Sequence, residues 1–368
     1  MKGLFLTMKK ITILSLFFVI LGLTNCTTQK EKLDSVDDIY RQQEIGKLNR
    51  IMKKHEVTSQ KFIVPFNKSS KIKGENGTTI LVNPNDLETI DGKSINANIE
   101  VELKELLNQS QLLKSNAQTV SDGKVLVSGG AYYINMTSNE QKLKLKDGKT
   151  LNVEFPKLSD NEMALFYGEK DSLGIINWQP TEIEFKINKT NVEFAKAKIA
   201  LPTAPMPYRA NQNLEDTLEE FKESLSHEEK IKVSRVIKGN SEIALQVYET
   251  VQLKQLGWIN CDRFLEIKDV TNLKFEFNPK DSTIVASVYL VFKDINSVME
   301  NSYFSLNGKT FENSFEGIPL GAKVKLIAFS GKNGEIYVHK SDIIIGENKT
   351  VKIDLRKIKE QELGRIFE

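Results

Sequence analysis

The chain has few of the residues from which catalytic and metal centres are usually built. Its 368 residues include only two cysteines, two tryptophans and three histidines. The histidines, His55, His227 and His339, stand far apart in the sequence, and none has another histidine or a cysteine three or four positions away. The sequence therefore argues against a zinc centre built on imidazoles and favours solvated surface histidines.

Recognised catalytic motifs are also missing. The sequence contains no G-x-S-x-G and no H-E-x-x-H, and Gly129-Gly130 has no third glycine and no helical pattern after it, so a hairpin turn explains it better than a phosphate loop. A glycosidase needs only two suitably spaced carboxylates, and no pair can be singled out. We therefore predict no enzyme, no metal and no cofactor, with an exported hydrolase as the least favoured alternative.

An excess of charge is absent as well. The formal net charge is +2, from 51 basic and 49 acidic residues. Three of the lysines, Lys2, Lys9 and Lys10, lie in an N-terminal segment without acidic residues; its removal leaves 48 basic residues against 49 acidic ones. A nucleic-acid partner would require a basic face, so none is predicted.

One long apolar run is present, Ile11–Leu23, and it follows these lysines directly. Basic residues before an uncharged apolar run are typical of a secretory signal, and the run is shorter than the about 20 residues that span a bilayer. Met8 stands directly before Lys9, so residues 1–7 are either translated or an extension upstream of the true start.

The end of the apolar run, Leu23-Thr24-Asn25-Cys26, resembles the lipobox of bacterial lipoproteins, although Asn25 is bulkier than the usual Gly, Ala or Ser. The resemblance implies a signal peptide of residues 1–25 and a diacylglycerol, with palmitate-type chains, on the Cys26 thiol. It implies an outer-membrane lipoprotein of the Bacteroidetes type, held at the membrane by that lipid. The periplasmic face and the cell surface both stay open.

Cys261 would then have no cysteine with which to pair inside the chain. It stands in the stretch GWINCDRF, which also holds the hydrophobic residues Trp258, Ile259 and Phe264. Free cysteine is among the most buried residue types, so we predict a buried, inert thiol and stability that comes from apolar cores.

Residues 26–60 are predicted to form a lipidated tether with a partly helical middle, because apolar residues are scattered there among charged ones. These apolar residues are Ile39, Ile45, Leu48 and Ile51. The tether would hold the folded body away from the membrane.

Residues 61–158 have the pattern of an antiparallel β-sandwich. Apolar and polar residues alternate from residue 95 to residue 104, and turn signals such as Asn76-Gly77 and Asp122-Gly123 follow at short spacing. The stretches GTTILVNPNDLETIDGKSINANIEVELKELL and VSGGAYYINMT resemble the sandwich module shared by ankyrins, netrin receptors and tight-junction scaffolds. The resemblance implies a scaffold for protein contacts. The His-Phe-Ser or His-Phe-Pro triplet of self-cleaving relatives is absent.

The rest of the chain divides into three parts. Residues 159–266 are predicted to be a mixed α/β middle region, with an amphipathic helix from Asn213 to Leu225 and with residues 242–256 as either helix or strand. Residues 267–356 resemble the small sandwich domains found beside carboxypeptidases. Residues 357–368 form a tail that is either a mixed-charge helix or a frayed end.

Aromatic residues offer the candidate binding contacts. Trp178 and Trp258 each stand beside Ile and Asn, and Tyr132 and Tyr133 point to opposite faces of one strand. Exposed, these rings could stack on sugars or anchor a partner. Core packing is the simpler interpretation, since large aromatics are highly buried on average.

Together these observations predict a mainly β protein: two antiparallel β-sandwich domains joined by a mixed α/β middle region, after a lipidated tether. The function they favour is a non-catalytic structural or protein-interaction module with an envelope protein as its partner. A surface lipoprotein that captures glycan or peptide is the alternative.

Overall fold

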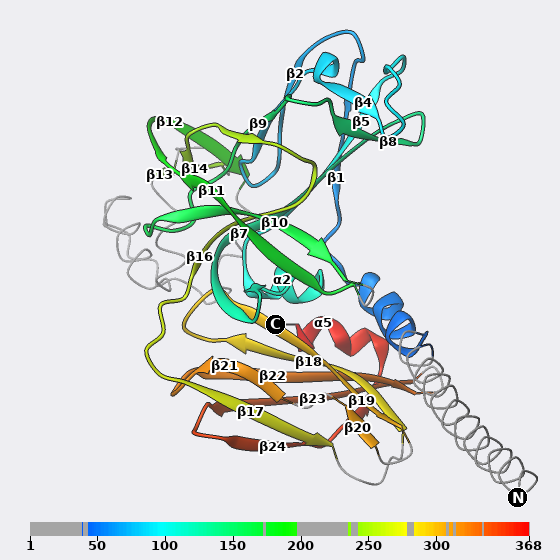
Figure 1. Cartoon of the computed structure of the whole chain (residues 1–368), viewed down its shortest axis with the longest axis vertical. Coiled ribbons are helices and arrows are strands. Elements are labelled where there is room, and N and C mark those ends of the chain that lie inside the picture. Colours follow the sequence, from blue (N-terminus) through cyan, green and yellow to red (C-terminus); the bar gives the residue numbers. More distant parts are fainter. Residues whose placement is uncertain are drawn as a thin grey trace, which may run out of the picture.

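The computed structural model describes residues 39, 43–171, 174–196, 235–236, 242–277, 283–306, 309–311, 314–332 and 335–367. These residues form a mainly β protein, as predicted, with two sandwiches one above the other (Figure 1).

The first sandwich consists of two facing sheets. The larger has the strand order β1 (Gln60–Val64), β5 (Ile99–Leu106), β7 (Lys124–Ser138), β16 (Gly257–Phe264), β10 (Met163–Lys170), β11 (Ile176–Phe185), with β4 (Leu87–Thr89), β6 (Val120–Ser121) and β8 (Gln141–Leu145) attached at its side. The smaller has the order β15 (Val251–Leu253), β9 (Leu151–Glu154), β3 (Thr79–Val82), β2 (Ser70–Lys73).

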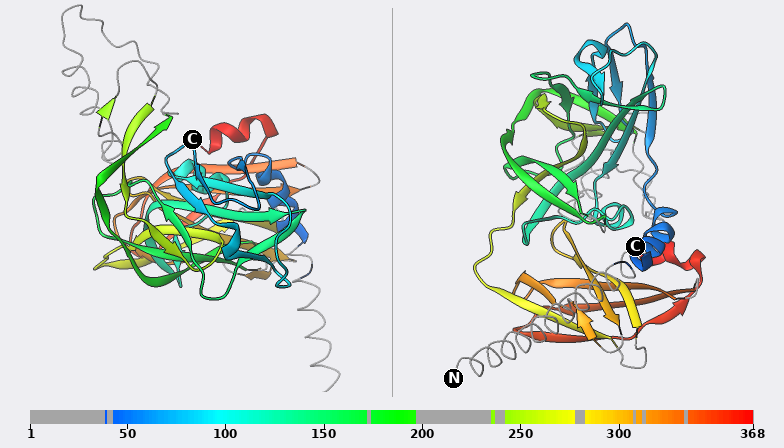
Figure 2. Two further views of the ribbon diagram at one scale, coloured as in Figure 1. Left: turned by 90° about the horizontal axis from the view of Figure 1, so that it is seen from above. Right: turned by 45° about the vertical axis from the view of Figure 1, so that its right-hand side comes forward.

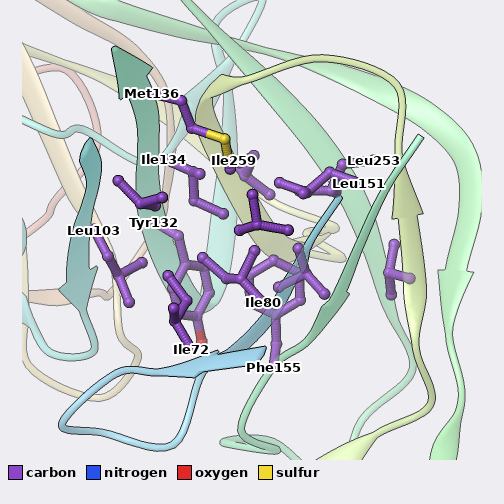
Figure 3. Packing of buried hydrophobic residues seen from close by; sticks show 14 of the residues in the cluster. Ile72, Ile80, Leu103, Tyr132, Ile134, Met136, Leu151, Phe155, Leu253 and Ile259 are labelled. Carbon is purple, nitrogen blue, oxygen red and sulfur yellow. The ribbon is translucent and has the colours of Figure 1, made fainter. Parts of the chain in front are cut away.

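Side chains from both sheets fill the space between them (Figure 3). On β5 the predicted alternation is confirmed, because Ile99, Val101 and Leu103 are fully buried while Glu100 and Glu102 are partly exposed. Tyr132 and Phe155 meet in this core with their ring centroids 4.5 Å apart.

The predicted middle region belongs to the first sandwich. β16 pairs with β7, β10 pairs with β16, and β15 pairs with β9. The proposed boundary at residue 158 therefore divides a single fold, and the described regular elements of residues 159–266 are all strands. Residues 242–256, for which the sequence leaves both helix and strand open, form the strands β14 (Glu242–Tyr248) and β15.

β14 also joins β12 (Ile187–Lys196) and β13 (Arg235–Val236) in a small sheet. The predicted helix from Asn213 to Leu225 lies outside the described residues.

The strands of the second sandwich run from Val270 to Ile358, so they lie in the predicted range 267–356 except for the last two residues. Its larger sheet has the order β20 (Lys309–Phe311), β19 (Val298–Leu306), β18 (Thr283–Phe292), β22 (Lys323–Lys332), β23 (Glu335–Ile344), β25 (Arg356–Ile358). The facing sheet has the order β21 (Ser314–Pro319), β17 (Val270–Phe277), β24 (Lys349–Ile353), of which β17 and β24 are parallel. These two sheets enclose a core of their own.

The two sandwiches also share a core. The first contributes Trp178, Trp258 and two leucines of α2 (Gln109–Lys114), and the second contributes a row of residues from its larger sheet, including Tyr289 and Phe329. Burying apolar side chains between two sheets of different domains favours one rigid unit over two independent ones.

Both ends of the described chain pack at this junction. A helix of residues 43–53, blue in Figure 1, lies beside the short C-terminal helix α5 (Leu363–Ile366), which follows a 3-10 turn at Glu360–Glu362 (Figure 2). Leu48 is 2% exposed and Leu363 is fully buried. The helical middle predicted for the tether is thus present, but it is docked on the body. The predicted tail contains the end of β25, the 3-10 turn and the short helix α5.

Candidate functional site

The four aromatic residues predicted as contacts lie in or beside the cores. Trp178 and Tyr132 are fully buried, Trp258 is 8% exposed, and Tyr133 is half-buried. Tyr132 and Tyr133 do point to opposite faces of β7, since Tyr132 belongs to the core of the first sandwich and Tyr133 packs at the junction.

Strand pairing brings three of these rings together. Tyr133 on β7 is opposite Trp258 on β16, and their ring centroids are 5.0 Å apart. Trp258 is opposite Gly168 on β10, which in turn is opposite Trp178 on β11. Gly168 is required there, because a Cβ would lie 2.7 Å from the Trp258 Cβ and 2.8 Å from the Trp178 ring.

The predicted contact of Trp178, Trp258 and Tyr132 with a ligand from solvent is therefore wrong, because these three rings are buried, whereas Tyr133 is half-buried. A sugar can stack only on an exposed aromatic face, and the rings of Trp178, Trp258 and Tyr132 face protein instead. The Trp178 Nε1 hydrogen is also used, as it is donated to the backbone oxygen of Gln118. These residues stabilise the sandwich and its junction.

The junction also holds a set of buried polar contacts. The loop after β18 and the start of β19 run along residues 107–128 of the first sandwich. The Thr119 backbone N donates to the Val298 oxygen at 2.7 Å, and the Val298 N donates to the Thr119 hydroxyl at 2.9 Å. Asn296 donates through Nδ2 to the Ser128 oxygen at 3.0 Å. Paired buried backbone groups of this kind fix the register between the two sandwiches.

A carboxyl group lies within this contact. The Tyr289 hydroxyl is 3.0 Å from the Glu300 Oε1 and 2.8 Å from the Asn116 Oδ1, so it joins a residue of the second sandwich to a residue of the first. Burial raises the pKa of Glu300 to about 7, although the hydrogen bond from Tyr289 acts in the opposite direction.

The hydrogen bonds among Tyr289, Glu300 and Asn116 depend on whether the Glu300 carboxyl group is protonated. A tyrosine hydroxyl has one hydrogen and cannot donate it to two oxygens at once. When Glu300 is protonated, its own hydrogen can go to the Tyr289 oxygen while Tyr289 donates to Asn116. When Glu300 is ionised, Tyr289 donates to the carboxylate, and the Asn116 amide must rotate to remain bonded.

The Lys170 side chain lies near Glu300, on the side of the first sandwich that faces the junction. Its ammonium is 5.0 Å from the Trp258 ring, and its neighbours include the ion pair of Lys104 with Glu56, whose atoms are 2.5 Å apart. Desolvation lowers the pKa of Lys170, and Glu56 and Glu300 oppose that shift.

Besides Glu300, sequence reasoning missed two buried carboxyl groups, those of Glu105 and Asp262. Glu105 is 2% exposed and accepts hydrogen bonds from the backbone N of Asn76 at 2.9 Å and of Thr78 at 3.1 Å. It thus holds the turn before β3, and a glutamate at an inward position of the strand pattern IEVELKEL was the available signal. Asp262 on β16 is fully buried beside Asn260, and burial raises its pKa well above the usual range. No local pattern identifies Asp262 as buried.

The remaining predicted residues have separate places. Cys26 and His227 lie outside the described residues. Cys261 is 1% exposed and unpaired, and burial raises the pKa of its thiol. His55 packs at 5.9 Å from the Phe367 ring, and His339 bonds the Ser341 hydroxyl at 2.9 Å. Within the described ranges, three or more His, Cys, Asp and Glu side chains do not gather into a group that could hold a metal ion.

The helices of the described residues are all too short or too polar to cross a membrane. Neither a family model nor a curated protein matches this chain.

Proposed function

We propose that this chain is a lipid-anchored protein of the bacterial outer membrane that acts as a non-catalytic structural or protein-interaction module. The observation that carries the proposal is the junction. Two sandwiches share an apolar core and a set of polar contacts, and the helix of residues 43–53, which follows the lipobox-like segment, packs into the same place. A body built in this way presents its surfaces in a fixed orientation to a partner.

The buried aromatic residues support an interaction module over glycan capture through those rings. With Trp178, Trp258 and Tyr132 in the cores, the alternative loses the side chains on which it depended. The edge strands of the sheets, such as β1 and β11, offer backbone groups of the kind that polypeptide partners use.

The anchor is tested by replacing Cys26. The Cys26→Ala variant should appear in the soluble fraction of cells that otherwise hold the protein in their membranes, because the lipid is attached through that thiol. Cys261→Ala serves as the matched control and should stay in the membrane fraction. Continued labelling of Cys26→Ala by a radioactive fatty acid would refute the anchor.

The module function is tested by chemical cross-linking in intact cells, followed by purification of the chain from detergent-solubilised membranes. A discrete cross-linked product with a second protein is expected. Recovery of the uncross-linked chain alone would count against the proposal.

A further inference from the structure

The larger sheet of the second sandwich is covered over only part of one face. Residues directly opposite each other on neighbouring antiparallel strands point to the same face. One such row runs from Tyr289 through Ile327 to Lys340, and the next runs from Val291 through Lys325 to Asp342. Along each row the residues change from buried ones at the junction to charged ones that contact solvent.

The uncovered part of this face is rich in basic residues. We call it the basic ledge; its members are Lys293, Lys323, Lys325, Lys340 and Arg356. Asp342 is the acidic residue of the two rows, and its carboxylate is bound by the Lys293 ammonium at 2.7 Å. In a mature chain with balanced charge, this concentration of one sign favours an anionic partner.

Two lysines of the ledge, Lys325 and Lys340, lie close enough for their positive charges to repel each other. Burial, and then the positive charge of Lys340, lower the pKa of Lys325. The Lys340 ammonium also reaches the backbone oxygen of Arg365 in α5 at 3.3 Å. An incoming carboxylate would reduce the repulsion between these like charges.

Beside the ledge, the outer edge of β23 is open. β22 pairs with the whole of β23, whereas β25 pairs only with residues 336–338 on the other side. Among the described residues, the segment Lys340–Ile344 therefore has no strand partner on its outer side. The Lys349 ammonium donates to the Ile344 oxygen at 3.1 Å, so the free part of the edge is residues 340–343 and the Ile344 N–H. An unpaired edge offers backbone N–H and C=O groups to an added strand, and its lysines discourage pairing with a second copy of the same edge.

We propose that the open edge of β23 and the basic ledge together bind an extended acidic segment of a partner polypeptide by strand addition. Alternate side chains of the added strand would face the ledge, where carboxylates meet Lys325 and Lys340. This inference rests on the proposed function as an interaction module and names the chemistry of its partner.

Two other anionic partners fit the site less well. A flat bilayer cannot lie on the ledge, because the first sandwich stands on the same sheet face (Figure 1). Glycan recognition usually uses an exposed aromatic ring. Among the aromatic side chains whose exposure the structure describes, those more than a third exposed are Phe66 and Phe264, both in the first sandwich.

The probe for this inference is a short synthetic peptide that alternates valine and glutamate and carries a fluorescent label. Binding to the full mature chain is followed by fluorescence anisotropy. We expect saturable binding that weakens from about 50 to about 300 mM NaCl, because salt screens the charge pairs. Methylation of alternate backbone nitrogens keeps the charge of the peptide and removes its ladder hydrogen bonds, so it should weaken binding about tenfold or more.

Charge reversal on the protein gives the second measurement. The double variant Lys325→Glu/Lys340→Glu should bind the probe at least about tenfold more weakly. The matched control, Lys274→Glu/Lys352→Glu, changes two exposed lysines of the opposite sheet and should bind normally. Thermal unfolding of both variants checks their folding, and the methylated peptide tests the unaltered chain in any case.

Several outcomes would overturn the inference. Equal binding of the methylated peptide, or of a valine and lysine peptide, would exclude charge-selected strand addition. Binding of dextran sulfate or of phosphatidylglycerol vesicles through the ledge, without binding of the peptide, would indicate a glycan or a membrane. A cellular cross-link that survives in Lys325→Glu/Lys340→Glu would leave the proposed function standing and place the partner elsewhere.

Discussion

At Glu300 a carboxyl group that ionises readily in water lies between two sandwiches, where burial opposes its charge. The groups that face it are Tyr289 and Ser287 from the second sandwich and Asn116, Asp171 and Lys170 from the first. Asp171 disfavours the charged form and Lys170 favours it. Its protonation is therefore part of the contact between the two sandwiches.

This arrangement predicts a pH-dependent stability. The pKa of Glu300 is raised from 4.5 to about 7 in the folded chain, so the folded state binds more protons than the unfolded state between these values. The contribution of Glu300 should thus fall as the pH rises from about 4.5 to about 7, by up to about 3 kcal/mol. Glu300→Gln keeps the shape and cannot ionise, so it should lose this dependence.

The measurement is urea unfolding of both proteins at several pH values. Since all other groups are shared, the free energy of unfolding of Glu300→Gln minus that of the original chain should increase with pH across this window. A difference that stays constant would show that Glu300 does not carry the effect.

Among the elements, the helix of residues 43–53 departs most from what its sequence suggested. Its spaced apolar residues predicted a helix in a tether, but Leu48 and Met52 belong to the shared core and Ile51 packs against it. Ile45, Leu48 and Met52 are each at most 5% exposed. An ion pair of Lys54 with Glu360, at 2.8 Å, connects the end of this helix to the C-terminal turn.

Docking of this helix can be measured with one truncation. Leu48→Ala removes a side chain that is 2% exposed and should lower the free energy of unfolding by about 2 to 4 kcal/mol. Lys47→Ala, one position away on the solvent side, is the matched control and should change it by less than about 0.5 kcal/mol. Equal effects of the two substitutions in urea unfolding would mean that the helix does not pack as described.

The strands also show which features of the fold can be predicted from the sequence. The strand β5 is predictable because an alternating pattern specifies both a strand and its buried face. The pairing of β16 with β7 is not, since residues more than a hundred positions apart meet through tertiary packing that neither pattern encodes locally. For this reason the middle region looked separate, and the meeting of Tyr133 with Trp258 could not be foreseen.

At the scale of the whole molecule, the question is whether the two sandwiches unfold together. Each has its own core, but a third core and the contacts of Thr119 with Val298 join them. A domain that loses its neighbour would expose the apolar face of the junction to water, which opposes independent unfolding. We therefore expect one cooperative transition.

The two tryptophans make this testable, because Trp178 and Trp258 stand on strands of the first sandwich and their rings belong to the shared core. Phe275 lies fully buried in the core of the second sandwich, against Phe315 and Tyr303. Phe275→Ala should lower the free energy of unfolding by about 3 to 5 kcal/mol. Since that loss is transmitted through the junction, the tryptophan fluorescence transition should move to lower urea together with the circular dichroism transition.

Lys274→Ala, on the solvent side of the same strand, is the control and should leave both transitions in place. If Phe275→Ala instead divided unfolding into two transitions, an early one and a later one at the urea concentration of the original chain, the sandwiches would be independent. The fixed orientation on which the interaction-module proposal depends would then be lost, because a partner bound at β23 could move freely relative to the anchor.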